Sequence, residues 1–279
     1  MGYNRYFTPA VKNILIINCI FFLATSIFRS VYHVELLMYL GDFFPLNHNF
    51  KPNQLFTNLF MHANFDHLFF NMVSLVMFGS ALENYMGTKK FLIFYFIAGL
   101  GGSLLNWAVN FYQYYHIANG AQFFLDNSTP RILESFIEKF NIISNSRFIS
   151  ENISIIDDWV KNSANSSGLS NVKMIISDYK THLADVDLRF ARVSIGASGS
   201  IFGLMIAYGF LFPDNMLYMM FFIPIKAKYW AVLGVMIEYY ITYANVPGDH
   251  INHLAHLGGG LMGLILIYFW NKQNKNNYY

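Results

Sequence analysis

The sequence predicts an all-α membrane protein, a bundle of six transmembrane helices with a polar extracytoplasmic insertion. The composition and six long apolar runs predict this class. Of the 279 residues, 55% are hydrophobic and only 12% are charged, whereas soluble domains carry about 25% charged residues. This composition excludes an ordinary soluble enzyme and a disordered chain. The net charge of +2 gives no polyanion-binding surface, so we expect no nucleic-acid partner.

Each predicted helix is an uncharged or nearly uncharged run close to the roughly 20 residues that cross a bilayer. The fifth run holds one acid, Glu238, and the sixth holds two histidines. Residues 216–225 are apolar but short and contain Pro224, so we expect a re-entrant or interfacial piece there. The six predicted spans are residues 13–28, 67–82, 91–112, 194–212, 229–245 and 251–270.

The distribution of cations orients the bundle. With six spans both termini lie on one side, and the loops of that side carry eight Lys or Arg residues against one clear acid, Asp214. The short loops of the opposite side carry few cations. By the positive-inside rule we expect both termini in the cytoplasm.

Residues 113–192 form a polar, nearly neutral insertion with eight Lys or Arg and nine acidic residues. They separate residues 1–112, with spans one to three, from residues 193–279, with spans four to six. Apolar residues recur among charges over 135–161, which predicts amphipathic helix, and residues 162–170 predict a flexible break. The plainest interpretation is a solvated surface insert. The sharper one is an extracytoplasmic cap or docking element that influences access to a nearby site.

Polar residues gather at the starts of spans two, four and six. The second span begins with His67 and Asn71, the fourth contains Ser198, and the sixth contains His253 and His256. In this topology the three starts lie at one extracytoplasmic depth. Polar groups in a bilayer are costly and usually face a cavity or a partner. Three helices that place them at one depth indicate a single site.

These residue types suit acyl transfer. Ser198 is a weak nucleophile that needs a base, and His256 on a neighbouring helix can supply it. His67 and Asn71 lie four residues apart on one helical face, and both can donate to a developing oxyanion. The backbone N–H groups at the start of the helix of Ser198 lack intrahelical partners and can donate as well.

Small residues support a close approach of the fourth and sixth spans. Gly199 and Gly203 have a small-xxx-small spacing, and Gly259, Gly260 and Gly263 share the face of the histidine three to seven residues before them. Each feature alone has a simpler explanation. A serine at a helix start is usually a cap, such glycines usually serve packing, and an intramembrane histidine usually serves structure. Their coincidence at one depth favours a serine-based site, with His253 as the rival base.

The residues then resemble a known family. Their four motifs are similar, in chain order, to the His…His-x-x-x-Asn, Glu-x-x-x-Gly, Gly-x-Ser-Gly and Ala-His…Gly…Gly motifs of rhomboid intramembrane serine proteases. The resemblance covers roughly residues 10–270 as one domain of the bacterial type, interrupted by the insertion. The motifs lie at residues 62–71 (His-Ala-Asn-Phe-Asp-His-Leu-Phe-Phe-Asn), Glu83 with Gly87, residues 196–199 (Gly-Ala-Ser-Gly) and residues 255–263 (Ala-His-Leu-Gly-Gly-Gly-Leu-Met-Gly).

The resemblance implies a role for each matching position. Ser198 matches the nucleophile and His256 the base of a dyad without a buried acid, and His67 and Asn71 match the oxyanion-stabilising side chains. Phe202 falls where an aromatic ring supports the catalytic imidazole. The remaining supporting positions are His62, which matches an outer histidine, and Gly196, Gly199, Gly259 and Gly263.

Two positions depart from the family pattern or lie outside it. The Trp-Arg pair often found in the first loop is absent, and Asn53 and Gln54 occupy that stretch. Glu238 is not part of the pattern, and we expect a hydrogen-bonded or water-facing carboxyl there. Four histidines at one depth are able to hold zinc, but a His-Glu-x-x-His motif is absent, and the one cysteine, Cys19, lies in the apolar run of the first span rather than beside them. We therefore expect no metal.

The resemblance implies an intramembrane serine endopeptidase that cleaves membrane-anchored proteins within or near their transmembrane segment. It further implies a bacterial inner-membrane location, contact with lipid, transmembrane protein substrates, an active site open to the extracytoplasmic side, and no cofactor. A catalytically silent rhomboid-like protein that binds transmembrane clients is the alternative. A transporter or channel predicts inverted repeats or a charged path, and the sequence has neither.

Overall fold

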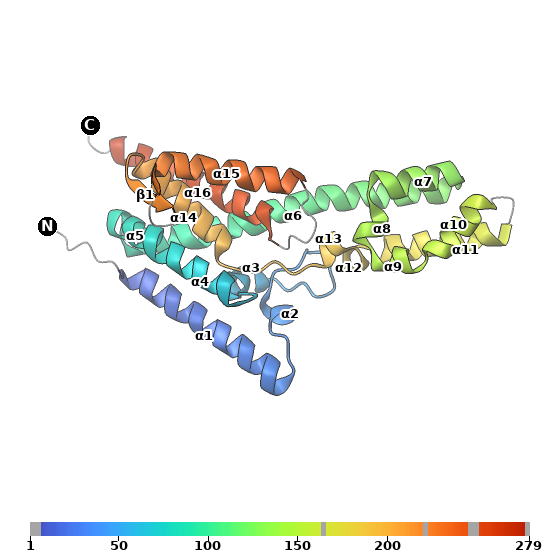
Figure 1. Cartoon of the computed structure of the whole chain (residues 1–279), viewed down its shortest axis with the longest axis horizontal. Helices are drawn as coiled ribbons and strands as arrows, with labels where there is room; N and C mark the ends of the chain where they lie inside the picture. The colour runs from blue at the N-terminus through green and yellow to red at the C-terminus, as the bar shows by residue number, and fades with distance from the viewer. Residues whose placement is uncertain (1–6, 163–165, 220–222, 245–250, 277–279) are drawn as a thin grey trace. The chain divides into compact units, whose positions relative to one another are not determined.

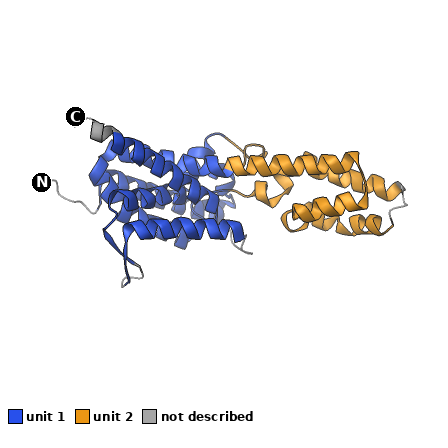
Figure 2. Ribbon diagram, turned by 90° about the horizontal axis from the view of Figure 1, so that it is seen from above, with its two compact units in different colours: residues 1–42, 52–106, 194–279 blue, residues 43–51, 107–193 orange. Residues whose placement is uncertain are grey.

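A computed structural model describes residues 7–162, 166–219, 223–244 and 251–276. The chain separates into two compact units (Figure 2). Unit 1 takes residues 1–42, 52–106 and 194–279, and unit 2 takes residues 43–51 and 107–193.

Six helical rods of unit 1 correspond to the six predicted spans (Figure 1). By length and composition four of them are able to cross a membrane: Pro9–Tyr32, Phe65–Met86, Thr88–Asp126 and His253–Lys272. The other two are shorter or less apolar. The rods are α1 (Pro9–Tyr32), the continuous α4 (Phe65–Ser74), η2 (Leu75–Gly79) and α5 (Ser80–Met86), then α6 (Thr88–Asp126), α14 (Ser198–Leu211), α15 (Ala227–Ala244) and α16 (His253–Asn276).

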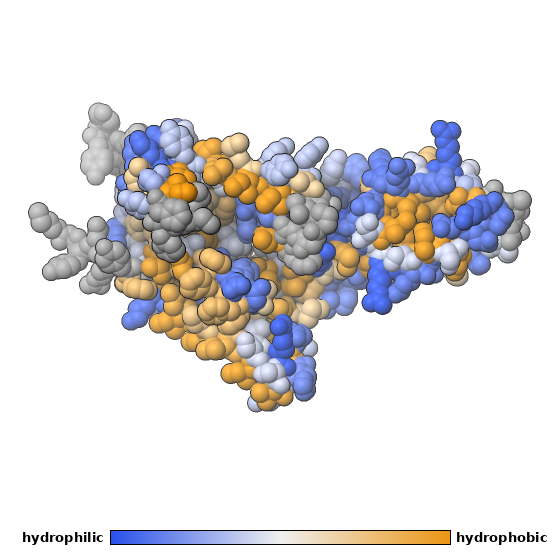
Figure 3. Space-filling model, viewed as in Figure 1, coloured by the Kyte–Doolittle hydropathy of each residue, from blue (hydrophilic) through white to orange (hydrophobic). Residues whose placement is uncertain are grey.

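The surface of unit 1 suits a lipid environment. Ile20, Leu23, Ile27 and Val31 on α1 are each more than half exposed, and hydrophobic side chains spread over this part of the molecule (Figure 3). Such exposure would be costly in water, whereas lipid tails satisfy it. The chain is therefore a multi-pass membrane protein with an all-α bundle, as predicted.

Two small features interrupt the helices of unit 1. The first loop holds α2 (Leu37–Leu40), α3 (Gln54–Thr57) and η1 (Asn58–Phe60). The apolar stretch 216–225 contributes to an antiparallel hairpin of β1 (Met216–Met219) and β2 (Ile223–Lys226), with Met216 opposite Lys226. This pairing satisfies the backbone of a segment that Pro224 excludes from a helix.

Glu83 fastens α1 to the end of α5. Its two carboxylate oxygens accept hydrogen bonds from the backbone N–H groups of Ala10 and Val11, each at 3.0 Å, and the Thr88 hydroxyl donates at 2.6 Å. The first N–H groups of a helix have no intrahelical partner, and the helix dipole favours negative charge there. The acid of the Glu-x-x-x-Gly motif therefore caps α1.

Unit 2 is helical and has a hydrophobic core of its own. Its most buried members include Phe124, Trp159, Ile176, Tyr179 and Phe190. The unit contains the second part of α6 followed by α7 (Pro130–Lys139), α8 (Ile142–Asn145), α9 (Arg147–Glu151), α10 (Ile153–Lys161), α11 (Ser166–Thr181), α12 (Leu183–Val186) and α13 (Leu188–Ala191).

The structure corrects two expectations for this region. The third predicted span stops at residue 112, but α6 continues as one helix to Asp126. The break expected over residues 162–170 is wrong for residues 166–170, which begin α11; residues 163–165 lie outside the described residues. Residues 43–51 belong to the same unit, because Asn47 Nδ2 donates to the Ala184 carbonyl at 2.8 Å.

Candidate active site

Ser198 is the first residue of α14, directly after a glycine-dependent turn. Gly196 has φ +116°, a conformation that L side chains rarely adopt, and its N–H donates to the Asn58 carbonyl at 2.9 Å. A Cβ on Gly196 would lie 2.7 Å from His67 Cε1 and 3.7 Å from Ser198 Oγ. Only glycine therefore permits this turn, and the edge of the His67 ring and the Ser198 hydroxyl share the space beside it.

The start of α4 is set by a cap that sequence analysis overlooked. Asn64 Oδ1 accepts a hydrogen bond from the backbone N–H of His67 at 2.8 Å, as an N-cap residue does. One turn later, Asn71 is 6% exposed, and its Nδ2 has no hydrogen-bond partner among the described residues. Buried polar groups are nearly always paired, so an unpaired donor requires an explanation. This one is available to a ligand oxygen.

The α14 and α16 backbones touch along a seam of glycines. A Cβ on Gly259 would lie 2.0 Å from the Gly199 carbonyl oxygen, and one on Gly263 would lie 2.9 Å from Gly203 Cα. Any larger residue would force the helices apart. Gly199, Gly259 and Gly263 therefore permit the approach on which the site depends.

Phe202 carries the contact to His256. The two rings are stacked, with centroids 5.8 Å apart and planes inclined by 16°. Ser198 precedes Phe202 by four residues and so shares its helical face. No hydrogen bond joins Ser198 to His256 among the described residues, and catalytic hydrogen bonds are often long without substrate.

His62 lies just before α4 and packs against His67, with ring centroids 4.9 Å apart. It is only 2% exposed. Burial, and secondly the nearness of His67, lower the pKa of His62 to about 4. His62 is therefore a neutral, enclosed ring behind His67.

Gln54 stands where the Trp-Arg pair is missing. Its side chain is fully buried, and its Nε2 donates to the Tyr39 carbonyl at 3.4 Å. Nearby, Thr57 Oγ1 donates to the Leu40 carbonyl at 2.7 Å, and Asn58 Nδ2 donates to the Gln54 carbonyl at 2.6 Å. A polar network thus anchors the first loop, and through Asn58 it reaches the Gly196 turn.

Glu238 is the residue that sequence analysis set aside. Its Oε2 lies 2.5 Å from His253 Nδ1 and its Oε1 lies 2.9 Å from His256 Nδ1. The contact with His253 is a hydrogen bond. The contact with His256 is short enough for a hydrogen bond, but its angle does not meet the geometry of one. A lone acid in an apolar span is costly unless it is paired, and that cost was the signal available in the sequence.

Among the described residues, Glu238, His253 and His256 are the three side chains that lie close enough together to hold a metal ion. Their ligand atoms lie within 4.8 Å of one another. The direct hydrogen bond between Glu238 and His253 already accounts for this proximity. The grouping therefore requires no ion to hold it together.

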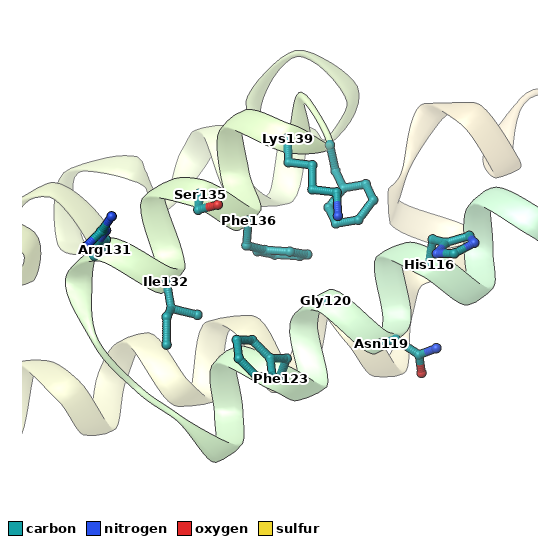
Figure 4. A pocket seen from close by; sticks show the side chains of 10 residues that line it. His116, Asn119, Gly120, Phe123, Arg131, Ile132, Ser135, Phe136 and Lys139 are labelled. Atoms are coloured by element: carbon teal, nitrogen blue, oxygen red, sulfur yellow. The ribbon is translucent and has the colours of Figure 1, made fainter.

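Unit 2 has a pocket of about 490 Å³ between α6 and α7 (Figure 4). Phe123, Ile132 and Phe136 face the space, and Arg131 and Lys139 also line it. No residue predicted to act in catalysis contributes to this pocket. The candidate site is instead formed by the starts of α4, α14 and α16 in unit 1.

Known proteins are similar to parts of this chain. A 71-residue stretch is 41% identical to "Rhomboid-like protease 3" of Toxoplasma gondii, covering 25% of this chain and 27% of that protein. A 71-residue stretch is 37% identical to "Putative rhomboid protease YdcA" of Bacillus subtilis, covering 25% of this chain and 36% of that protein. The chain thus matches about a third or less of the length of these relatives. The Rhomboid domain family matches residues 49–123 and 167–273. The chain, with its helical bundle and its four motifs in order, belongs to the rhomboid family.

Proposed function

We propose that the protein is an intramembrane serine endopeptidase that uses Ser198 as nucleophile and His256 as general base. The observation that carries this proposal is the meeting of Ser198 and His67 beside Gly196, on the helical face where Phe202 stacks on His256. A nucleophile, a base and an oxyanion donor are the parts that acyl transfer needs.

In the proposed reaction the Ser198 hydroxyl attacks the scissile carbonyl carbon while His256 Nε2 accepts its proton. The carbonyl oxygen becomes an oxyanion that His67, Asn71 and the Ser198 backbone N–H stabilise. Collapse breaks the C–N bond, and the imidazolium returns the proton to the leaving amine. Water then attacks the acyl-enzyme with His256 again as base, which frees the acid product and the serine.

The substrates are proposed to be transmembrane proteins, cleaved within or near their membrane segment at the extracytoplasmic side of a bacterial inner membrane. The cation asymmetry of the loops supports this orientation. We propose in addition that residues 113–192 influence substrate access. Cysteine accessibility measures the orientation: a cysteine at exposed Ser144 should be labelled by an impermeant reagent from outside. Labelling only from the cytoplasm would reverse the topology.

The cleavage test uses the full chain reconstituted in vesicles with a single-span reporter. Ser198→Ala and His256→Ala should each abolish cleavage. Ser200→Ala is the matched control, because Ser200 is a buried serine of the same helix whose hydroxyl donates to the Tyr95 carbonyl at 2.7 Å. Cleavage that persists in Ser198→Ala would refute the proposal. Absence of cleavage with retained binding of the reporter would favour the catalytically silent, client-binding alternative.

A further inference from the structure

Glu238 is the acidic side chain at the candidate base. It stands on α15 and its side chain is 16% exposed. The carboxylate divides its oxygens between two histidines of α16, with Oε2 on His253 and Oε1 on His256. Both contacts are made by the Nδ1 atoms. One carboxylate therefore spans α15 and α16 at the residue on which the proposed reaction depends.

The chemistry of imidazole gives this contact a direction. A carboxylate only accepts hydrogen bonds, so an Nδ1 atom facing it carries the proton. In neutral His256 this leaves the Nε2 lone pair free, which is the tautomer a general base needs. When Nε2 takes the proton of Ser198, the imidazolium that forms faces a negative charge.

The geometry divides the carboxylate into an anchored oxygen and an available one. The hydrogen bond to His253 is directed and holds Oε2 in place. His256 Nδ1 lies 2.9 Å from Oε1 but off the hydrogen-bond direction. A modest rotation of the imidazole aligns it, and catalytic hydrogen bonds often tighten when substrate binds.

We propose that Glu238 is a positioning residue that fixes the tautomer and orientation of His256, so that the site works as a Ser198–His256–Glu238 triad. This inference rests on the proposed serine protease function. His253 holds the carboxylate in place and is not the base. The competing interpretation is a clamp in which Glu238 and His253 only join two helices.

Substitutions at position 238 separate the two. In Glu238→Gln, the amide N–H₂ group is able to donate to His256 Nδ1 and hold the wrong tautomer, while the side chain keeps its size. A triad therefore predicts that Glu238→Gln labels at least as slowly as Glu238→Ala, and about 10⁴-fold more slowly than the parent, the loss seen when a triad acid is replaced. A clamp predicts that Glu238→Gln labels faster than Glu238→Ala, because Gln still bridges the two helices and Ala does not.

The experiment measures the rate at which a fluorophosphonate labels Ser198 across pH, using the full chain in detergent. The titratable groups facing His256 are His67 from α4, His253 from its own helix and Glu238 from α15. Glu238→Gln should slow labelling without lowering thermal stability. In a plot of its labelling rate against pH, the acid limb should move to lower pH, because the His256 imidazolium loses its negative neighbour. The matched control Glu35→Gln makes the same change at a half-exposed acid that pairs with Arg29, and it should label at the rate of the parent.

The outcomes distinguish this inference from the function on which it rests. If the parent labels at Ser198 and Glu238→Gln labels equally fast with an unmoved acid limb, the triad is wrong and the protease proposal stands. Loss of parent labelling after treatment with a chelator would place a metal at the three side chains instead. A folded parent that never labels would refute the proposed function, and the triad with it.

Discussion

The rings of Phe202 and His256 stack across the α14–α16 seam, with centroids 5.8 Å apart. This contact fixes which face of α16 meets the start of α14. It also holds the imidazole nearly parallel to the phenyl ring, with the two planes inclined by 16°. Phe202 packs at the same time against α16 itself, since a Cβ on Gly260 would lie 2.9 Å from Phe202 Cδ1. The base is therefore oriented by packing as well as by polar contacts.

Replacing Phe202 by Leu should slow turnover with little change in substrate binding. Leucine fills most of the volume but lacks the flat face on which the imidazole rests. An aromatic pair contributes about 0.5–1.5 kcal/mol beyond burial, so kcat should fall roughly two- to tenfold. Phe202→Tyr keeps the ring and should retain turnover. Steady-state kinetics on a reporter measures both variants, and equal rates for Leu and Phe would show that the stacking has no catalytic effect.

Asn71→Ala should lower kcat far more than it raises KM. The unpaired Nδ2 is a donor for charge that exists only in the transition state, and removal of one oxyanion donor costs about 2.7–4 kcal/mol. Asn18→Ala is the control, because Asn18 is an equally buried amide that donates to the Ile14 carbonyl of its own helix. If both variants turned over alike, Asn71 would be a structural side chain only.

Stability should fall as the pH drops from about 6.5 to about 4, and His62 should contribute to the fall. The folded pKa of His62 is depressed to about 4, against about 6.5 in an unfolded chain. Between these values the unfolded state binds more protons, so stability rises with pH across the window and is lost toward its acid end.

The His62→Gln variant isolates this contribution. Its melting temperature should depend less on pH than that of the parent between pH 4 and 6.5, whereas His182→Gln, at an exposed histidine of unit 2, should leave the dependence unchanged. Identical curves for the parent and His62→Gln would mean that His62 is not buried neutral in the folded protein.

Asp187→Ala should destabilise unit 2. The fully buried Asp187 accepts hydrogen bonds from the Tyr179 hydroxyl at 2.7 Å and from Arg189 Nε at 2.8 Å. Burial, and secondly the charge of Asp187, raise the pKa of Tyr179. Removing one partner of a buried pair leaves the other uncompensated and costs about 3–5 kcal/mol.

Hydrogen exchange measures this cost over residues 107–193. Protection of the core amides should drop in Asp187→Ala and remain in the control Asp178→Ala, which removes an exposed acid from α11. Full protection in Asp187→Ala would show that the hydrophobic core alone holds the unit.

The sequence predicted the bundle because its helices are long apolar runs and each run has a physical minimum length. It also predicted that Ser198, His67 and the glycine seam would meet, because small residues and polar residues at a helix start leave a local signature. The role of Glu238 was not predictable in the same way. Whether an acid on α15 faces α16 depends on how that helix is rotated, which no local pattern records.

Other differences have similar causes. The continuation of α6 past residue 112 was missed because a polar stretch was interpreted as loop, although Gln113 to Asp126 contains no proline and only one glycine. The association of residues 43–51 with unit 2 depends on long-range contacts such as Asn47 with Ala184. The Asn64 cap had a sequence signal, an asparagine directly before an apolar helix, and it was overlooked among the histidines.

The central claim is that Ser198 is an activated nucleophile. The most direct measurement is fluorophosphonate labelling of the full chain in detergent, with the modified peptide identified by mass spectrometry. The account predicts an adduct on Ser198 in the parent and in Ser200→Ala, and none in Ser198→Ala or His256→Ala of equal thermal stability. An adduct on another residue, or labelling that survives Ser198→Ala, would contradict it.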